Sequence, residues 1–146
     1  MTENASRFPL FVDLTGRRCV IVGGGAIAQR RAAVLSRFGA AVTVIAPTWT
    51  GDVPGVDWQA PGDLKGAFLA VAATNDRSVN RQVGEEARAL GIPVTVADCR
   101  EECTFFFPAV CEGGGVTAGL ISRHGTDHHR AARAAKAVRQ ALEGLD

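Results

Sequence analysis

A glycine-rich segment offers the clearest chemistry in the sequence. Gly23-Gly24-Gly25-Ala26-Ile27-Ala28 stands between a short apolar run and a segment with helical spacing. In such a strand–turn–helix, Gly23 permits a tight turn, Gly25 lets the backbone approach a pyrophosphate, and Ala28 lets the helix pack closely on the strand. The helix N-terminus then supplies N–H donors and positive potential to an anion. The pattern favours a dinucleotide site, and a glycine turn without a ligand is the alternative.

The end of the second predicted strand departs from the usual dinucleotide pattern. An Asp or Glu there would bind the ribose hydroxyls of NAD, but Ile45-Ala46-Pro47-Thr48 contains no carboxylate. Thr48 or backbone groups could contact the adenosine ribose instead. No arginine follows at once to bind a 2′-phosphate, so the spacing leaves NAD and NADP both open.

Two more loops are expected beside the glycine turn. In an open parallel sheet the ligand lies outside the carboxyl ends of the strands. Thr74-Asn75-Asp76 and Asp98 each follow a predicted strand and therefore fall at that edge. Asp98 stands where a catalytic carboxylate is expected, and the alternative is an aspartate that only forms the turn at the strand end.

Three cysteines and the nearby histidines raise the question of a metal site. Cys99, Cys103 and Cys111 are separated by three and seven residues, which matches none of the usual paired zinc spacings. We therefore predict no metal site and expect small, partly buried thiols. The three histidines, near the start of the last predicted helix, could bind anionic groups or a metal, or simply face solvent. They are His124, His128 and His129.

A parallel sheet would bring these residues together, and the chain alternates accordingly. Short apolar runs predict strands, and longer segments with helical spacing predict helices. The strands are expected at 19–22, 41–46, 56–58, 67–73 and 93–97, and the helices at 26–38 and 78–90. Right-handed crossovers then give an α/β fold with a Rossmann-like parallel sheet and helices on both faces.

The chain changes character after Asp98. Two extended segments, 104–108 and 116–122, are expected around Glu112-Gly113-Gly114-Gly115, followed by an alanine-rich helix over 127–142. Two strands and one helix bury too little surface to be stable alone, so they extend the sheet or pair with a second copy of the chain. We accordingly divide the chain into residues 1–98, a Rossmann-like domain with the candidate cofactor site, and residues 99–146, a small α+β segment.

Composition excludes several classes of function. The 146 residues are 47% hydrophobic, enough for a folded core, and the formal net charge of +1 argues against a broad nucleic-acid or membrane surface. No apolar run reaches the length of a transmembrane helix, and four cysteines beside a good core point to free thiols in a reducing cytoplasm. The chain has no tyrosine and its histidines stand together, which excludes an alcohol dehydrogenase that relies on either residue elsewhere. All basic residues except Lys65 and Lys136 are arginines, a bias that fits either binding of a small polyanion or a high-GC gene.

Taken together, these segments resemble a known family. The run Asp13-Leu14-Thr15-Gly16-Arg17-Arg18-Cys19-Val20-Ile21-Val22-Gly23-Gly24-Gly25 is similar to the opening of the siroheme synthase N-terminal module. That family comprises precorrin-2 dehydrogenases, some of which are also sirohydrochlorin ferrochelatases. The resemblance continues in order over about residues 8–142. Its further motifs are Gly39-Ala40-Ala41-Val42-Thr43-Val44, Ala72-Ala73-Thr74-Asn75-Asp76, Val79-Asn80, Gly91-Ile92-Pro93-Val94, Val96-Ala97-Asp98 and Phe105-Phe106-Phe107-Pro108-Ala109.

The resemblance implies NAD-dependent dehydrogenation of precorrin-2 to sirohydrochlorin by a homodimer, with residues 1–98 as the NAD-binding domain and residues 99–146 as the segment for dimerisation and substrate binding. Insertion of Fe²⁺ to give siroheme is a further activity of some family members. The resemblance also implies NAD at the glycine turn and Asp98 as the essential carboxylate. Precorrin-2 carries many carboxylates, which we expect to be bound by Arg100, Ser122, Arg123, His128 and Arg130. The expected cofactor residues are Gly23, Gly24, Gly25, Ala26, Ile27, Pro47, Thr48, Thr74 and Asn75.

Departures from the family pattern affect substrate binding and iron insertion. Thr95 stands where the family usually has asparagine, and Cys99 and Arg100 stand where a second acidic residue and a proline are frequent. The family's serine- and glycine-rich turn is replaced by residues 122–128, and its further helical domain is expected to be absent because the chain ends at Asp146. Two alternatives remain open: a non-catalytic module that senses NAD(H), and a chelatase or metal-delivery protein without redox activity.

Overall fold

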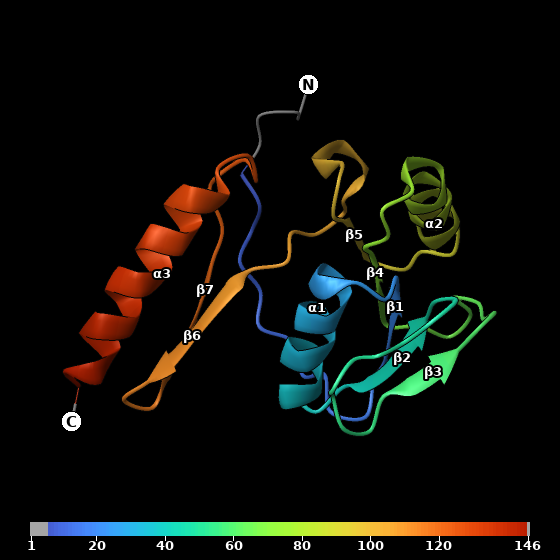
Figure 1. Ribbon diagram of the computed structural model, residues 1–146. Coiled ribbons are helices and arrows are strands. Elements are labelled where there is room, and N and C mark those ends of the chain that lie inside the picture. The colour runs from blue at the N-terminus through green and yellow to red at the C-terminus, as the bar shows by residue number, and fades with distance from the viewer. Residues whose placement is uncertain (1–5, 146) are drawn as a thin grey trace. The chain divides into compact units, whose positions relative to one another are not determined.

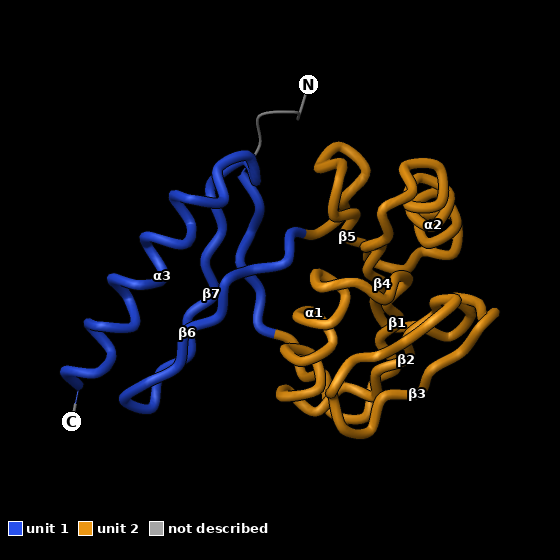
Figure 2. The backbone as a smooth tube through the Cα atoms, viewed as in Figure 1, with its two compact units in different colours: residues 1–11, 106–146 blue, residues 12–105 orange. Residues whose placement is uncertain are grey.

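The computed structural model describes residues 6–145, which form two compact units (Figure 1, Figure 2). Unit 2 is residues 12–105 and contains a five-stranded parallel sheet. Unit 1 combines the described part of segment 1–11 with residues 106–145 and contains a two-stranded antiparallel sheet and one helix.

The sheet of unit 2 has the strand order β3-β2-β1-β4-β5. Its central strand, β1, pairs in parallel with both β2 and β4. The chain therefore builds one half of the sheet outward from β1 and then crosses to the other side of β1 to build the second half. The elements are β1 (Arg18–Val22), α1 (Ala26–Arg37), β2 (Ala41–Ile45), β3 (Asp57–Gln59), β4 (Leu69–Ala72), α2 (Arg77–Ala89), β5 (Val94–Val96) and the short 3₁₀ helix η1 (Arg100–Glu102).

The strand order confirms the predicted Rossmann-like fold. Helix α1 packs on β1 and β2, and α2 packs on β4 and β5. Because these two crossovers run in opposite directions along the sheet, right-handed connections place their helices on opposite faces. The direction reverses between β1 and β4, and the carboxyl ends of these two strands are where such sheets bind their ligands.

Aliphatic side chains of the inner strands form the core of unit 2. Val20, Ile21, Val44, Val71 and Val94 are at most 1% exposed. Strands covered by helices on both faces carry continuous apolar runs rather than an alternating pattern, which is why short apolar runs were sufficient to locate them. Each such side chain contributes about 1.5–3 kcal/mol by leaving water.

The boundary between the units lies at residue 105 because the segment after Asp98 is bound to β5. The Sγ atom of Cys103 accepts a hydrogen bond from Val96 N–H (3.1 Å), and Thr104 N–H donates to Val94 O (2.8 Å). These bonds keep η1 within unit 2. The division predicted at residue 98 concerns function and stays a prediction.

The hairpin of unit 1 corrects one predicted strand. Strand β6 covers Ala109–Gly113 and β7 covers Val116–Leu120, so the extended segment expected at 104–108 is wrong. Gly114 and Gly115 have φ values of +55° and +77°, as a two-residue hairpin turn with left-handed central residues requires. The sequence Glu112-Gly113-Gly114-Gly115 predicts a four-residue connection instead, and this places the first strand too close to the N-terminus.

Helix α3 (His128–Glu143) covers this hairpin, and the predicted helix over 127–142 is confirmed. Its contact with the strands is centred on three buried residues, Cys111, Ala135 and Leu142. Four partly buried residues surround them: Ala109, Ala118, Leu120 and Val138. These residues form the small apolar core of unit 1, and the expectation that this part is not stable alone stays a prediction.

Candidate functional site

The glycine turn after β1 is fixed by two neighbouring loops. Gly23 has a φ of +134°, and a Cβ atom there would lie 2.3 Å from Ala73 O. Its N–H donates to Ile45 O (2.9 Å). A Cβ atom on Gly24 would lie 2.5 Å from Thr48 O. The protein's own backbone therefore requires both glycines, because any side chain would displace the loops that follow β2 and β4.

Gly25 differs from its two neighbours, because the described chain leaves open space beside it. A Cβ atom there would meet nothing within 4 Å, and its φ of −85° suits any residue. Gly25 is the N-cap of α1, which receives no side-chain cap. Ala26 and Ile27 in the first turn are exposed, whereas Ala28 is fully buried. Open space at an uncapped helix N-terminus fits a phosphate-bearing ligand.

The loop after β2 borders the glycine turn and is held by β3. Ala46 is buried, its N–H donates to Gln59 O (3.1 Å), and its carbonyl accepts from Trp58 Nε1 (3.0 Å). Pro47 and Thr48 follow and are exposed. The two residues expected to contact the adenosine part of a cofactor thus lie beside the glycine turn.

The loop after β4 is fixed by a buried asparagine. Asn80 in α2 is 0% exposed, and its Oδ1 accepts from Thr74 N–H (3.0 Å) and Thr74 Oγ1 (2.6 Å). Its Nδ2 donates back to Thr74 O (3.0 Å). Asn75 is exposed, and Asp76 caps α2. The three hydrogen bonds hold Thr74 in place and leave Asn75 free to meet a ligand.

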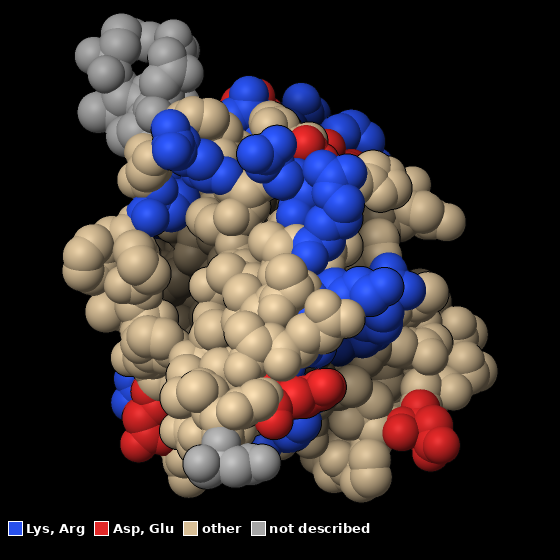
Figure 3. All heavy atoms as spheres, turned by 90° about the vertical axis from the view of Figure 1, so that its left-hand side faces the viewer, with Lys and Arg blue, Asp and Glu red and all other residues tan. Residues whose placement is uncertain are grey.

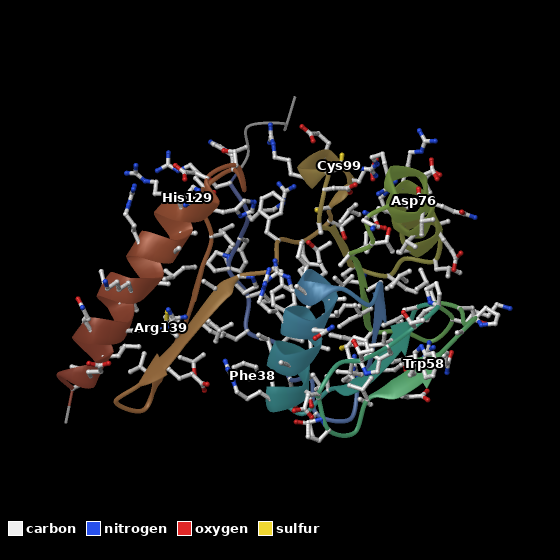
Figure 4. All side chains as sticks on the ribbon, in the orientation of Figure 1. Phe38, Trp58, Asp76, Cys99, His129 and Arg139 are labelled. Atoms are coloured by element: carbon white, nitrogen blue, oxygen red, sulfur yellow. The ribbon has the colours of Figure 1, made fainter. Side chains whose placement is uncertain are left out.

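Asp98 follows β5 and forms an ion pair with the first residue of α2. Arg77 Nη1 lies 2.9 Å from Asp98 Oδ1, and Arg77 Nη2 contacts Glu102 Oε1. The Asp98 side chain is 40% exposed. Figure 4 shows the neighbourhood, with Asp76 at the start of α2 and Cys99 in the loop after β5. Asp98 therefore combines solvent access with an ion pair that restricts the orientation of its carboxylate.

Three residues of this region escaped the sequence reasoning. Asn80 belongs to a quoted motif, and its polar side chain on an otherwise apolar helix face was the signal available. Arg77 and Glu102 are 25 residues apart in the sequence, and no spacing rule connects them.

The other predicted substrate residues, apart from Arg100, belong to unit 1. Ser122 Oγ accepts from Asp127 N–H (3.1 Å), and Asp127 caps α3 by accepting from Arg130 N–H (2.9 Å). Arg123, His128 and Arg130 are exposed, so this turn brings four of the five together. Figure 3 shows basic side chains on the side of unit 1 that includes α3. In unit 2, Arg100 pairs with Glu101 (3.5 Å).

The cysteines and histidines form no metal site within residues 6–145. That part of the chain contains no group of three or more His, Cys, Asp or Glu side chains able to hold an ion. All four cysteines are free thiols, as expected, and Cys19, Cys103 and Cys111 are buried. Burial raises the pKa of the Cys19 thiol to about 11.

Comparison with known proteins places this site in a family. The family described as "Putative NAD(P)-binding" matches residues 10–109. The chain belongs to this family. The match includes the glycine turn, the three loops around it and Asp98, so every residue proposed for the cofactor lies inside the matched range.

Curated relatives confirm the resemblance to the siroheme synthase N-terminal domain. The "Probable multifunctional siroheme biosynthesis protein HemA" of Ruminiclostridium josui is 39% identical over 96% of this chain and 29% of its own length. The siroheme synthase of Nitrosomonas eutropha is 36% identical over 82% of this chain and 27% of its own length. The chain thus spans less than a third of these relatives. A solved structure titled "SirC, precorrin-2 dehydrogenase" matches with a TM-score of 0.74 and 26% identity over 94% of this chain and 72% of that one.

Proposed function

We propose that the chain is an NAD-dependent dehydrogenase that oxidises precorrin-2 to sirohydrochlorin. The similarity to a structure titled as a precorrin-2 dehydrogenase supports the substrate. One observation carries the proposal: the glycine turn and Asp98 share one edge of one sheet. Ala73 N–H donates to Val22 O (2.8 Å), and Ala97 N–H donates to Ala72 O (2.9 Å). Through these bonds the loop of Asp98 is tied to β4, and β4 is tied to the strand that ends in the glycine turn.

The residues around the glycine turn fit a dinucleotide. The open space beside Gly25 and the N-terminus of α1, at Ala26 and Ile27, would receive the pyrophosphate. The adenosine would lie along the exposed residues Pro47 and Thr48. Thr74 and Asn75, after the neighbouring strand, would border the nicotinamide half. When bound, NAD⁺ supplies the acceptor for the hydride that leaves a ring carbon of the substrate.

Asp98 accepts the proton that leaves the substrate together with the hydride. Loss of one hydride and one proton converts precorrin-2 to sirohydrochlorin, so the carboxylate and the cofactor together balance the reaction. In unit 2, Arg100 binds a carboxylate of the substrate, for which a charge-assisted hydrogen bond is the strongest available contact. In unit 1, the turn before α3 offers further groups for substrate carboxylates, namely Ser122, Arg123, His128 and Arg130.

A homodimer is the assembly that fits unit 1. Phe8, Leu10 and Phe11 are 84%, 74% and 74% exposed, which places three large apolar side chains in water within four residues. The small core of the hairpin and α3 also needs further apolar cover. Sedimentation equilibrium tests the assembly, and a monomer at micromolar concentration would contradict it.

The proposed location is the cytoplasm. All four thiols are free, as in a reducing compartment. Within residues 6–145, no helix combines the length and the apolar character that crossing a bilayer requires.

An anaerobic assay with precorrin-2 and NAD⁺ tests the proposed function. We expect NADH and sirohydrochlorin to form in equal amounts. Asp98→Asn preserves the size of the side chain but removes the proton acceptor, and it should lower turnover by about 10²–10⁴-fold with unchanged NAD⁺ affinity. Near-normal turnover in this variant would remove Asp98 from the mechanism.

The same assay separates the two alternative functions. NAD(H) binding without oxidation of precorrin-2 would indicate a sensing module. Supplying sirohydrochlorin and Fe²⁺ without NAD⁺ tests metal insertion directly, and siroheme formation by a protein that does not oxidise precorrin-2 would indicate a chelatase.

A further inference from the structure

One arginine joins two carboxylates beside the proposed proton acceptor. Arg77 donates through Nη1 to Asp98 Oδ1 (2.9 Å) and through Nη2 to Glu102 Oε1. The two acceptors come from different elements, the loop after β5 and η1. The Glu102 side chain is 20% exposed, half as much as Asp98 at 40%. The guanidinium therefore has one sheltered partner and one accessible partner.

Glu102 is itself held by backbone contacts. Its N–H donates to Cys99 O (3.2 Å), and its carbonyl accepts from Arg88 Nη1 (2.7 Å). A single exposed ion pair contributes little, because ordering two long side chains offsets the attraction. A guanidinium already fixed by Glu102 loses less freedom when it also bonds Asp98. The sheltered carboxylate thus orients the cation toward the accessible one.

The charges around Asp98 are balanced unevenly. Arg77 contributes one positive charge, and Glu102 contributes a negative charge that shares it. The carboxylate of Asp76, on the same helix as Arg77, accepts from the N–H groups of the first helical turn instead. The other ionisable groups of these elements are Cys99, the ion pair of Arg100 with Glu101, and four residues of α2, namely Arg81, Glu85, Glu86 and Arg88.

We propose that Arg77 is a positioning residue for the dehydrogenation: it holds the Asp98 carboxylate in one orientation, and Glu102 fixes the guanidinium for this role. The inference rests on the proposed function, which assigns proton transfer to Asp98. A general base must lie within hydrogen-bond reach of the proton that it removes, so a carboxylate that rotates freely spends less time in the productive geometry.

Two substitutions should affect the same step to different degrees. Arg77→Gln removes the bridging guanidinium, so the Asp98 carboxylate loses its fixed orientation. Glu102→Ala leaves Arg77 bonded to Asp98 alone and less restrained, so its effect should be smaller. A merely structural role for the cluster would lower the stability of the fold and leave kcat of the folded variants unchanged.

The test compares kcat and KM for precorrin-2 with the KM for NAD⁺. We expect kcat to fall by about tenfold or more in Arg77→Gln and by a smaller factor in Glu102→Ala, with the KM for NAD⁺ nearly unchanged. Arg77→Lys keeps the charge but not the paired donors and should restore little of the lost kcat; full recovery would show that charge alone suffices and would contradict the positioning role. Arg81→Gln, at an exposed position of the same helix, is the control and should leave kcat unchanged.

A second readout does not depend on activity. Crystal structures of the variants show the orientation of Asp98 directly, and we expect its carboxylate to leave the wild-type rotamer in Arg77→Gln. An Asp98 side chain that keeps its rotamer in a folded Arg77→Gln protein overturns the inference, even if dehydrogenation is confirmed. A reoriented Asp98 in a protein whose wild type does not oxidise precorrin-2 overturns the proposed function, and with it the catalytic purpose assigned to Arg77.

Discussion

Asn80 and Thr74 are joined by three hydrogen bonds, of which the shortest runs 2.6 Å from Thr74 Oγ1 to Asn80 Oδ1. The amide replaces the neighbours that Thr74 would have in a continuing strand, and it ends β4 at the point where the chain must turn toward α2. Ala73, the preceding residue, packs against Gly23, so this contact also fixes the backbone on which the glycine turn rests. A buried side chain thereby sets the geometry of a site that it does not line.

Replacement of this asparagine should destabilise the fold. In Asn80→Ala the N–H and carbonyl of Thr74 lose their partners, and we expect the free energy of unfolding to fall by about 2–4 kcal/mol. Urea denaturation followed by circular dichroism measures the change. Asn75→Ala, at an exposed position of the same loop, should cost less than about 0.5 kcal/mol and act on cofactor affinity instead. Equal stability of the two variants would contradict the role given to Asn80.

The glycines of the turn should respond differently to alanine. Gly25→Ala meets open space at an ordinary φ, so the fold should be retained while NAD⁺ affinity falls by about tenfold or more, because the new methyl group occupies the space proposed for the pyrophosphate. Gly25→Asp should abolish binding by adding like charge. Gly23→Ala instead places a Cβ atom 2.3 Å from Ala73 O at a left-handed φ, and it should impair folding itself.

Isothermal titration with NAD⁺, together with thermal unfolding, separates these effects. Unchanged affinity in a folded Gly25→Ala protein would show that the dinucleotide does not approach this glycine.

The sequence predicted the elements of unit 2 well because each of them is determined by residues that are close together in the sequence. The run Cys19-Val20-Ile21 is buried, and Gly23 and Gly39 adopt the left-handed conformations that only glycine accepts easily. The candidate cofactor loops followed from this, since topology alone brings the carboxyl ends of parallel strands together. Unit 1 was harder, because the pairing of Gly113 with Val116 depends on a two-residue turn inside a longer glycine run.

Sequence patterns do not predict contacts between side chains that are distant in the sequence. The Arg77–Asp98 pair joins residues 21 apart, and either residue alone is unremarkable on an exposed surface. Cys103 is buried, as expected for a small thiol. The hydrogen bond that its Sγ accepts from Val96 N–H, at the end of β5, is visible only in the structure.

Stability should depend on pH through the cap of α2. Hydrogen bonds from the Ser78 side chain and from the N–H groups of Val79 and Ser78 lower the pKa of Asp76 below its ordinary value of 3.8. The folded state therefore favours the ionised carboxylate, and this contribution is present above the unfolded-state pKa and lost as pH falls through the folded-state pKa. Asp76→Asn keeps an acceptor at the cap but does not titrate.

We expect wild-type protein to lose more of its urea stability between about pH 6 and pH 3 than Asp76→Asn does. Asp13 also has a lowered pKa, through hydrogen bonds from Thr15, so part of the wild-type pH dependence should persist in the variant. Identical losses in the two proteins would exclude Asp76 as a source.

One thiol should react in the native protein. Cys99 is partly exposed, whereas Cys19, Cys103 and Cys111 are buried. The Cys19 thiol, with a pKa raised to about 11 by burial, is also almost fully protonated at neutral pH and therefore unreactive. A chromogenic disulfide reagent should titrate one fast equivalent in native protein and four after denaturation. Cys99→Ser should remove the fast equivalent, and its persistence would show that a buried thiol is opened by local unfolding.

The turn before α3 offers a direct test of substrate binding. Arg130 bonds Asp127 through its backbone N–H, so Arg130→Gln preserves the helix cap and removes only the exposed guanidinium. If this group binds a substrate carboxylate, its loss should raise the KM for precorrin-2 by about tenfold, with kcat and the KM for NAD⁺ nearly unchanged, as expected for a contact made equally in the ground and transition states. Arg133→Gln, exposed one turn further along the same helix, removes the same charge and controls for long-range attraction. An equal rise in both variants would assign the effect to the overall field of α3, whereas no rise in Arg130→Gln would remove this residue from the substrate site.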